Sequence, residues 1–232
     1  MDSKKKIKII KDGPYLVSGS VPLEEQSIKF EPEGHLFLTT RKYPEQENYA
    51  LCRCGHSKNQ PFCDGSHLTT GFDGSETASR EPFIERATRI EGPDLILLDD
   101  LELCALVRFC HQPHGDAWTL TEESDNPQFR AEAIQGVCEC ASGRLVAIDK
   151  QTGETIEPEF EPSLAILQDP GRECSGPIFV RGGIPVESAD GTVYEIRNRM
   201  TLCRCGESEN KPFCDATHMA IGFSDHDPEE ES

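Results

Sequence analysis

The sequence of 232 residues contains no long hydrophobic run. No stretch approaches the roughly 20 apolar residues that a membrane-spanning helix requires, so we expect a soluble protein with no membrane partner. The basic segment at residues 1–11 is followed by neither an apolar stretch nor a small-residue cleavage site. This absence argues against a secretory signal, and we therefore expect a cytoplasmic location.

Positive charge is also scarce. The chain has 23 Lys and Arg residues against 42 Asp and Glu residues, which gives a formal net charge of −19. Such a surface would repel nucleic acid and anionic membranes, so we expect neither as a partner. A basic protein or a small redox protein is compatible with this charge, and so is a simple role of the acidic residues in solubility.

The sequence lacks the short motifs of several enzyme classes. It has no glycine-rich dinucleotide fingerprint, no P-loop and no nucleophile elbow. We therefore expect no second cofactor of these kinds, and we predict that the chain is not itself an enzyme.

Cysteine, in contrast, is abundant, with eleven residues. In a reducing compartment, clustered cysteines bind metal more often than they form disulfides. Cys52 and Cys54 are too close in sequence to pair easily, and the same holds for Cys203 and Cys205. The odd total also prevents complete pairing within one chain, so the cysteines predict metal sites.

The chain contains an internal repeat. Residues 51–72 read LCRCGHSKNQPFCDGSHLTTGF and residues 202–223 read LCRCGESENKPFCDATHMAIGF, with 14 of 22 positions identical and no gap. Upstream, residues 13–24 resemble residues 176–187, and both segments begin with Gly-Pro. The repeat unit therefore runs from this Gly-Pro to the Gly-Phe that follows the histidine.

Strand-like runs dominate each copy, so each is predicted to be a small β meander that leads into a metal loop. The expected strands are 15–17, 27–30 and 35–38 in the first copy and 178–180 and 192–196 in the second. Turns are expected at Glu33-Gly34 and Asp190-Gly191.

The segment between the copies has a different, β-α-β-α-β pattern. We expect helices over 99–111 and 128–135, the second begun by Asp125-Asn126-Pro127, and strands over 95–98, 118–120 and 144–148. The predicted fold class is α+β, with two β-rich repeats and a small insert. The predicted domains are 1–80, 90–150 and 171–223, followed by an acidic, disordered tail at 224–232.

Each repeat presents four candidate ligands at the same spacing: Cys52, Cys54, Cys63 and His67, then Cys203, Cys205, Cys214 and His218. Residues two apart in an extended segment point to the same side, and residues four apart share one face of a helical turn. Three thiolates and one imidazole suit zinc as well as an iron–sulfur cluster. Zinc sites usually separate paired cysteines by two to four residues, so the single residue here favours [2Fe–2S].

Residues 52–67 resemble the CDGSH iron–sulfur motif of the mitoNEET family, in the pattern Cys-x-Cys-x2-Ser-x3-Pro-x-Cys-Asp-Gly-Ser-His. The second copy matches with Ala216-Thr217 in place of Gly65-Ser66, which predicts that this position needs no left-handed backbone. The resemblance implies one [2Fe–2S] cluster per motif. Cys52 and Cys54 would bind one iron, and Cys63 and His67 the other.

The same resemblance implies a non-enzymatic protein that transfers electrons or clusters to a redox or cluster-acceptor protein. A histidine ligand raises the cluster potential and releases iron when protonated, so we expect cluster loss below about pH 6. We expect the second cluster to have the lower potential, because Glu207 and Glu209 lie beside it. The alternatives are a zinc-stabilised binding module and an electron-relay subunit of an oxidoreductase.

In mitoNEET-like proteins two chains pair, each with one motif. Because this chain carries both motifs, we expect a monomer with an internal pseudo-dimer in preference to a homodimer. Two independent lobes separated by the middle segment are the other arrangement.

The middle segment is similar to the divergent single-cluster 4Fe-4S ferredoxin-like domain. Cys104, Cys110 and Cys140 fall on its cysteine positions, although Ala141 replaces a proline. A fourth ligand would have to come from Cys138 or Cys174, unless the site holds a [3Fe–4S] cluster or nothing. On a straight helix Cys104 and Cys110 would point about 120° apart, so we favour a degenerate scaffold over a third cluster.

Overall fold

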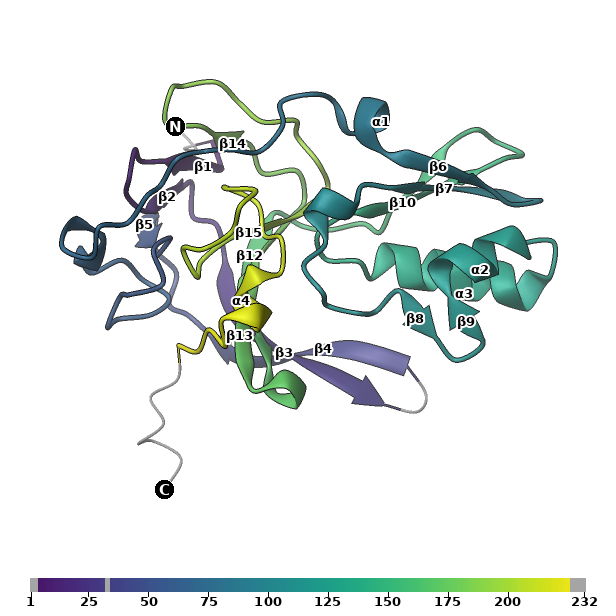
Figure 1. Ribbon diagram of the computed structural model, residues 1–232, viewed down its shortest axis with the longest axis horizontal. Helices are drawn as coiled ribbons and strands as arrows, with labels where there is room; N and C mark the ends of the chain where they lie inside the picture. Colours follow the sequence, from purple (N-terminus) through teal and green to yellow (C-terminus); the bar gives the residue numbers. More distant parts are fainter. Residues whose placement is uncertain (1–3, 32–33, 226–232) are drawn as a thin grey trace.

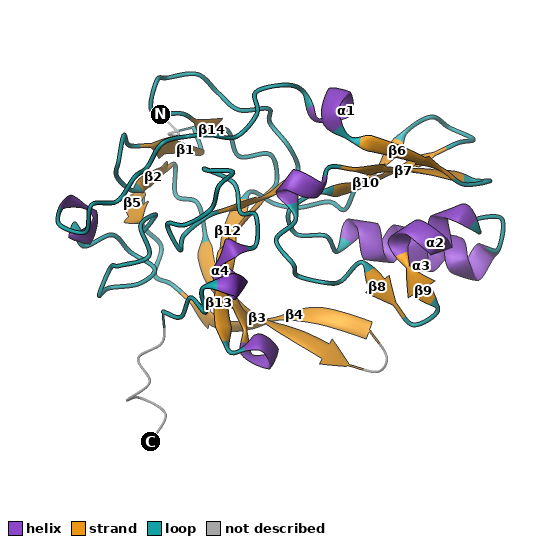
Figure 2. Ribbon diagram, viewed as in Figure 1, coloured by secondary structure: helices purple, strands orange, loops and turns teal. Residues whose placement is uncertain are grey.

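The computed structural model describes residues 4–31 and 34–225 of the chain and has the predicted α+β fold, with strands predominating (Figures 1 and 2). In the part that is described, no helix has both the length and the apolar character needed to cross a membrane. The Glu33 turn and residues 226–232 of the predicted tail lie outside the described residues.

One four-stranded sheet has the order β14-β1-β2-β5. Its strands are β1 (Lys6–Ile9), β2 (Tyr15–Ser18), β5 (Asn48–Leu51) and β14 (Val186–Glu187). Buried and more exposed side chains alternate along β1, β2 and β5, which is the period-2 pattern of a strand with one face in a core. The sheet therefore combines three strands of the first repeat with one strand of the second.

A five-stranded sheet has the order β15-β13-β12-β3-β4. Its strands are β3 (Leu23–Glu31), β4 (Gly34–Lys42), β12 (Ser163–Asp169), β13 (Cys174–Arg181) and β15 (Arg199–Leu202). β12 begins before residue 171, where the sequence places the start of the second repeat. Here the second repeat supplies the centre of the sheet, and the first repeat supplies one edge.

The two repeats exchange equivalent strands. β14 pairs in parallel with β1 in the register Ile7↔Val186, and β3 pairs in parallel with β12 in the register Leu164↔Leu23. Leu23 and Val186 are equivalent positions of the repeat, so the two pairings are related by an internal pseudo-twofold axis. Side chains of both repeats share one apolar core. The repeats are therefore not independent lobes.

The middle segment forms a separate antiparallel sheet, β11-β10-β7-β6, with helices on one face, to the right in Figure 1. The strands are β6 (Thr88–Glu91), β7 (Leu95–Asp99), β10 (Leu145–Asp149) and β11 (Thr155–Ile156). The helices are α2 (Ala117–Glu122) and α3 (Pro127–Cys138), preceded by the hairpin β8 (His111–Gln112) and β9 (Gly115–Asp116). The short helices α1 (Phe83–Arg86) and α4 (Thr217–Ala220) lie outside this segment.

The structure confirms the predicted strands at 95–98 and 144–148 and the helix that Asn126 caps. The predicted strand at 118–120 is wrong, because Asp116 caps a helix there with a capping box. The predicted strand at 192–196 is also wrong, since only an isolated bridge joins Val193 to Glu187.

The helix predicted over 99–111 is wrong as well. A 3₁₀ turn at Leu101–Leu103 is followed by an irregular loop with positive φ at Leu106 and Arg108. Alternate side chains of this loop are buried, at positions 103, 105, 107 and 109. This alternation in burial indicates an extended chain, and the sequence does not reveal it because Cys104 and Leu106 are apolar as well.

Arg199 of β15 fixes the middle segment to the second repeat. This buried side chain donates hydrogen bonds of 2.6, 3.0 and 2.9 Å to the carbonyl oxygens of Val137, Cys138 and Cys140. It also forms an ion pair with Glu157. The last carbonyl groups of a helix lack intrahelical partners, so Arg199 satisfies the end of α3 and holds the Cys140 turn in place.

Candidate metal centres

The first site begins where β5 ends. Cys52 and Cys54 follow this strand, both are buried, and their Sγ atoms lie 3.7 Å apart. Two thiolates bound at ~2.3 Å to one tetrahedral metal are separated by about 3.7 Å. The pair is therefore preorganised for a single metal atom.

Cys63 and His67 form the second pair of this site. The distance from Cys63 Sγ to His67 Nδ1 is 3.5 Å, which again fits one tetrahedral metal. His67 lies in the 3₁₀ turn Ser66–Leu68. Backbone hydrogen bonds from Cys52 to Pro61 (2.8 Å) and from Cys63 to Ala50 (2.9 Å) hold the two pairs beside each other.

The second repeat reproduces this arrangement. The Sγ atoms of Cys203 and Cys205 are 3.6 Å apart, and Cys214 Sγ lies 3.4 Å from His218 Nδ1. Within residues 4–31 and 34–225, no three His, Cys, Asp or Glu side chains converge on one point where a single ion would sit. Each repeat therefore offers two separate ligand pairs.

A serine and an aspartate shape each ligand loop. Ser57 donates to the Phe62 carbonyl at 2.6 Å, and Asp64 accepts hydrogen bonds from the backbone of Lys58 and Ser66 at 2.9 Å. The bonds to Ser66 and Lys58 hold the pKa of Asp64 well below its usual value, so Asp64 is ionised. Ser208 and Asp215 make the equivalent bonds in the second repeat.

The position before the histidine turn is left-handed in both repeats. Gly65 has φ +90°, and Ala216 has φ +71° in the equivalent place. The prediction that this position needs no left-handed backbone is therefore wrong. A β-carbon costs roughly 1–2 kcal/mol in this region, so the second repeat tolerates a strained alanine.

The two ligand loops pack against each other. Gly55 and Gly206 have positive φ, and a β-carbon would lie 2.4 Å from the Cys205 carbonyl oxygen at Gly55 and 2.6 Å from that of Cys54 at Gly206. Only glycine permits this reciprocal approach. Tyr15 of the first repeat adds a hydrogen bond of 2.7 Å from its hydroxyl to the Cys203 carbonyl of the second, a contact that sequence reasoning missed.

The two sites differ in burial. Cys63 and His67 are partly exposed, whereas Cys214 and His218 are only 4% and 5% exposed. Burial and the neighbouring Arg204 lower the pKa of His218 to about 4. The first site is therefore open to solvent and the second is closed.

The arginine between the paired cysteines also has different partners in the two repeats. Arg204 forms an ion pair with Asp225. Although burial acts in the opposite direction, Arg204 lowers the pKa of Asp225 to about 2, so the carboxylate is ionised. Arg53 has Gly74 at the equivalent position and bonds its carbonyl. Its buried Nε and Nη1 atoms have no hydrogen-bond partner in the described ranges.

Cys104, Cys110 and Cys140 line one small cavity in the middle segment, of about 30 Å³. Burial and the nearby Cys140 and Cys104 raise the pKa of Cys110 to about 12. Because the segment from Cys104 to Cys110 is a loop, the predicted 120° separation on a helix does not apply. The three cysteines therefore line the same cavity.

The proposed fourth ligands lie elsewhere. Neither Cys138 nor Cys174 lines this cavity; the nearest acceptor of the Cys138 thiol is the Ile156 carbonyl, and Cys174 pairs with Asp169 across β12 and β13. No histidine or carboxylate lines the cavity either. Among the described residues, the candidate ligands that line the middle site are therefore three cysteine thiols.

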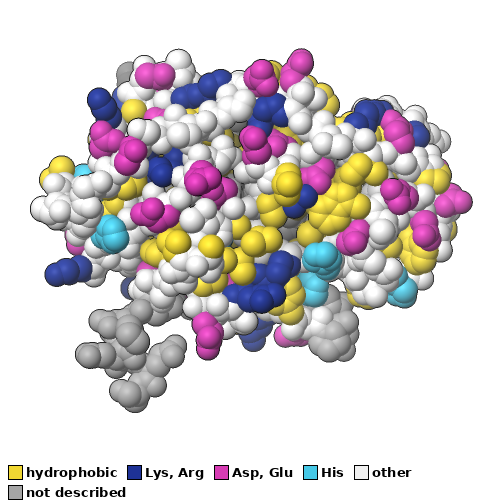
Figure 3. Space-filling view, in the orientation of Figure 1, with side chains coloured by type: hydrophobic (Ala, Val, Ile, Leu, Met, Phe, Trp, Pro, Cys, Tyr) yellow, Lys and Arg dark blue, Asp and Glu magenta, His cyan; other side chains and the backbone are white. Residues whose placement is uncertain are grey.

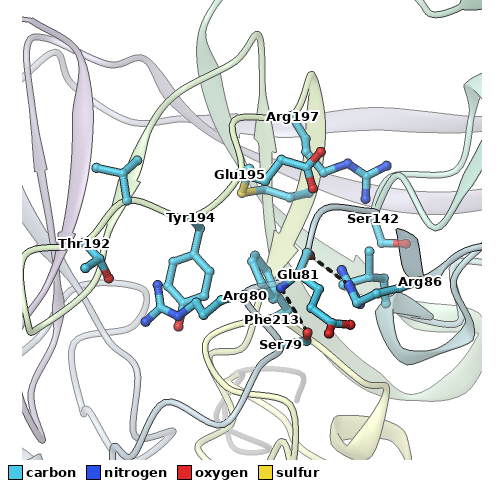
Figure 4. A pocket seen from close by; sticks show the side chains of 13 residues that line it. Ser79, Arg80, Glu81, Arg86, Ser142, Thr192, Tyr194, Glu195, Arg197 and Phe213 are labelled. Carbon is cyan, nitrogen blue, oxygen red and sulfur yellow. Dashed lines mark hydrogen bonds between the residues drawn. The ribbon is translucent and has the colours of Figure 1, made fainter. Parts of the chain in front are cut away.

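A larger cavity, of about 230 Å³, lies where the two repeats and the middle segment meet (Figure 4). Arg80 stacks over Tyr194, with its guanidinium carbon 3.6 Å from the ring centroid. Leu103 and Phe213, which precede Cys104 and Cys214, both line this cavity. The middle site and the second repeat's site are therefore neighbours across this junction.

Comparison with known families agrees with this description. Residues 12–68 and 175–219 match the family of iron-binding zinc fingers of CDGSH type. Two segments of the chain therefore match the CDGSH family. Residues 90–150, between these domains, match the family described as a divergent 4Fe-4S mono-cluster. Neither a curated protein nor a solved structure matches the chain. The family matches confirm an iron–sulfur protein.

Proposed function

We propose that each CDGSH domain binds one [2Fe–2S] cluster and that the protein transfers electrons or clusters to a partner protein. One observation carries this proposal: each domain presents two ligand pairs, each spaced for one tetrahedral metal, and no third donor joins a pair. Two pairs suit two metal atoms held together by inorganic sulfide, whereas a mononuclear zinc site requires four converging donors.

The chain's own residues prepare the sites for such a cluster. The thiolate is the form of cysteine that binds metal. The Cys54 thiol, together with nearby backbone N–H groups, lowers the pKa of Cys52 despite burial, and Cys205 does the same for Cys203. The Cys52–Cys54 and Cys203–Cys205 pairs therefore each favour one thiolate, the form that binds iron. The bound cluster would supply one-electron chemistry between ferric and ferrous iron.

The histidine gives each cluster a ligand that can be released by protonation. An imidazole that gains a proton on its metal-binding nitrogen no longer binds iron. His67 is partly exposed, so the first domain is the better placed to exchange electrons or a cluster with a partner.

The partner is inferred to be a redox protein or cluster acceptor with a basic contact surface, in keeping with the net charge of −19. In Figure 3, acidic side chains are spread over the visible face, with Lys and Arg in separate small groups. Because the two CDGSH domains already pair within one chain, we propose that the protein acts as a monomer.

Anaerobic purification with iron, sulfide and zinc analysis tests the proposal. Two [2Fe–2S] clusters give about four irons and four sulfides per chain. Cys63→Ser and Cys214→Ser, each removing a ligand from one domain, should each lose the signal of one cluster in visible and electron paramagnetic resonance spectra. Stoichiometric zinc without sulfide would contradict the proposal and favour a zinc-stabilised binding module.

A third cluster in the middle segment is a second proposal, and the cavity shared by Cys104, Cys110 and Cys140 favours it. The three thiols suit a [3Fe–4S] cluster or a [4Fe–4S] cluster with one iron free of protein ligands. The iron count separates the cases, because a third cluster would raise it from about four to about seven or eight per chain. Cys110→Ser should return the count to about four.

A further inference from the structure

We propose that the second CDGSH domain is the internal member of a linear relay, placed between the middle site and the first CDGSH domain. The proposal rests on the clusters assigned under Proposed function and adds their order in the chain of electron transfer. Three observations carry it: the packing of the middle loop on the second site, the contact between the two ligand loops, and the difference in burial.

The loop that bears Cys104 and Cys110 packs directly on the second site. Cys214 belongs to the same buried apolar cluster as Ala105, Val107, Phe109 and Ala141. Ala105, Val107 and Phe109 lie between Cys104 and Cys110, and Ala141 follows Cys140. The residues that surround the middle site and a ligand of the second cluster are thus parts of one packed unit.

The chain segments that precede Cys104 and Cys214 are in contact as well. Phe213 packs against the buried cluster that contains Leu103, and Asn210 donates a hydrogen bond of 2.8 Å to the Glu102 carbonyl. These contacts place the chain leading to Cys104 beside the chain leading to Cys214. They fix the distance between the middle site and the second site.

The second site touches the first through the paired glycine loops. A β-carbon at Gly55 or Gly206 would collide with the carbonyl of Cys205 or Cys54, respectively. Cys54 and Cys205 are ligands of different domains, so the two loops that carry the ligands are in direct backbone contact. Among the described residues, none of the first site's ligands belongs to the apolar cluster formed by the middle loop.

The burial of the ligands indicates which sites are the two ends of the relay. All four ligands of the second domain are buried. Cys63 and His67 at one end, and the cysteines of the middle site at the other, are partly exposed. Electrons therefore enter and leave at the first and middle sites and cross the molecule through the second.

Each internal step moves one electron. A ferrous iron in the donor cluster becomes ferric, a ferric iron in the neighbouring cluster becomes ferrous, and no covalent bond is made or broken. A one-electron carrier protein, reduced at one end and oxidised at the other, completes the balance; dithionite serves as the reductant in the test.

Electron paramagnetic resonance of the dithionite-reduced full chain tests the order, because only neighbouring paramagnetic centres split or relax each other strongly. Cys110→Ser should remove the splitting or faster relaxation that the middle centre causes in the second cluster's signal. It should leave the first cluster's signal unchanged. Cys63→Ser should change the second cluster's signal and leave the middle centre's unchanged. An unchanged second signal in Cys110→Ser, or an equal change in the first, would overturn the relay.

Wild-type protein poised at a series of potentials provides a measurement without any substitution. The relaxation of the second cluster's signal should change as the middle centre passes between its two oxidation states, which differ in total spin, and constancy would overturn the relay. An iron count of about four, without a third signal, would also overturn it but leave the two-cluster function standing. Absence of both iron and sulfide would overturn both.

Discussion

The two CDGSH domains hold the same ligands at the same spacing, yet their surroundings differ. In the first domain His67 is partly exposed and Arg53 has no carboxylate in contact among the described residues. In the second, His218 is buried and Arg204 is paired with Asp225. The motif thus places the same candidate ligands in both domains, whereas the rest of the chain determines how far each site is open and which charges surround it.

The middle segment is the main source of this difference. Its loop from Cys104 to Cys110 covers Cys214, and Arg108 of this loop pairs with Asp169 beside the second domain. Nothing comparable covers Cys63 in the described structure. The segment between the two repeats therefore makes the surroundings of a nearly symmetric pair unequal, and the following predictions test whether this inequality affects function.

The largest effect is expected from Gly206→Ala, which tests whether the two domains need to be paired. A β-carbon 2.6 Å from the Cys54 carbonyl oxygen combines overpacking with left-handed strain, so we expect a loss of about 3 kcal/mol in the free energy of unfolding. Denaturant unfolding measures this. Gly222→Ala is the matched control, since its φ is also positive but no atom lies within 4 Å. Equal losses in the two variants would show that the loop contact is unimportant.

The second-largest effect is expected from low pH, at which the two clusters should be lost at different rates. Protonation detaches the imidazole, so the cluster with the lower histidine pKa survives to lower pH. Burial and Arg204 lower the pKa of His218 to about 4, so the second cluster should persist at pH 5, whereas His67 is partly exposed and its cluster should decay faster there. Visible absorption followed at pH 5 in Cys63→Ser and Cys214→Ser, each retaining one cluster, measures both rates.

We expect decay to be at least ~10-fold slower for the second cluster than for the first. His67→Cys and His218→Cys are the controls, since a cysteine ligand removes the imidazole and should abolish the difference. Identical decay rates in the two single-cluster variants would contradict a role for burial.

Asp225→Asn tests the charge difference. Removing this carboxylate leaves Arg204 as an unbalanced cation near the second cluster, which favours the reduced form, so its potential should rise. We expect a shift on the order of 59 mV, equivalent to a tenfold change in the equilibrium constant. A redox titration of the variant measures it, with Asp73→Asn, an exposed carboxylate of the first domain, as the control.

In the wild-type protein, the second cluster should have the lower potential for two reasons. Asp225 balances the positive charge of Arg204, and Glu207 and Glu209 lie nearby. The reverse order in single-cluster variants would contradict both arguments. A shift of the same size in Asp73→Asn would show that general surface charge, rather than the Arg204–Asp225 pair, sets the potential.

The sequence predicted the two pairs of neighbouring side chains in each site because their approach depends on local spacing, whereas their role as ligands stays a prediction. Cys52 and Cys54 share one side of an extended chain, and a turn brings His67 to Cys63, so short-range geometry suffices. The internal pairing of the repeats followed from their number. The strand exchange did not, because the pairing of Ile7 with Val186 joins residues far apart in sequence and no local pattern encodes it.

The middle segment shows where sequence reasoning failed. Buried side chains at positions 103, 105, 107 and 109 alternate with more exposed ones, but Cys104 and Leu106 between them are apolar too, so the sequence does not show this period of 2. The observed loop removes the helical argument against a shared site for Cys104 and Cys110, and the degenerate scaffold stays a prediction. The burial of His218 could not be predicted either, because it depends on how this loop packs on another domain.

The smallest effect is expected from Gly65→Ala, which copies the second domain's Ala216 into the first. The position has φ +90° with no atom within 4 Å of a β-carbon, so only backbone strain opposes the change. That strain, less the entropy lost by the flexible glycine on folding, should cost about 0.5–1 kcal/mol in denaturant unfolding. The first cluster's absorption at pH 7 should be unchanged, because Ala216 already precedes a histidine turn of the same geometry. Loss of that cluster would show that the two domains differ in backbone tolerance as well as in burial and charge.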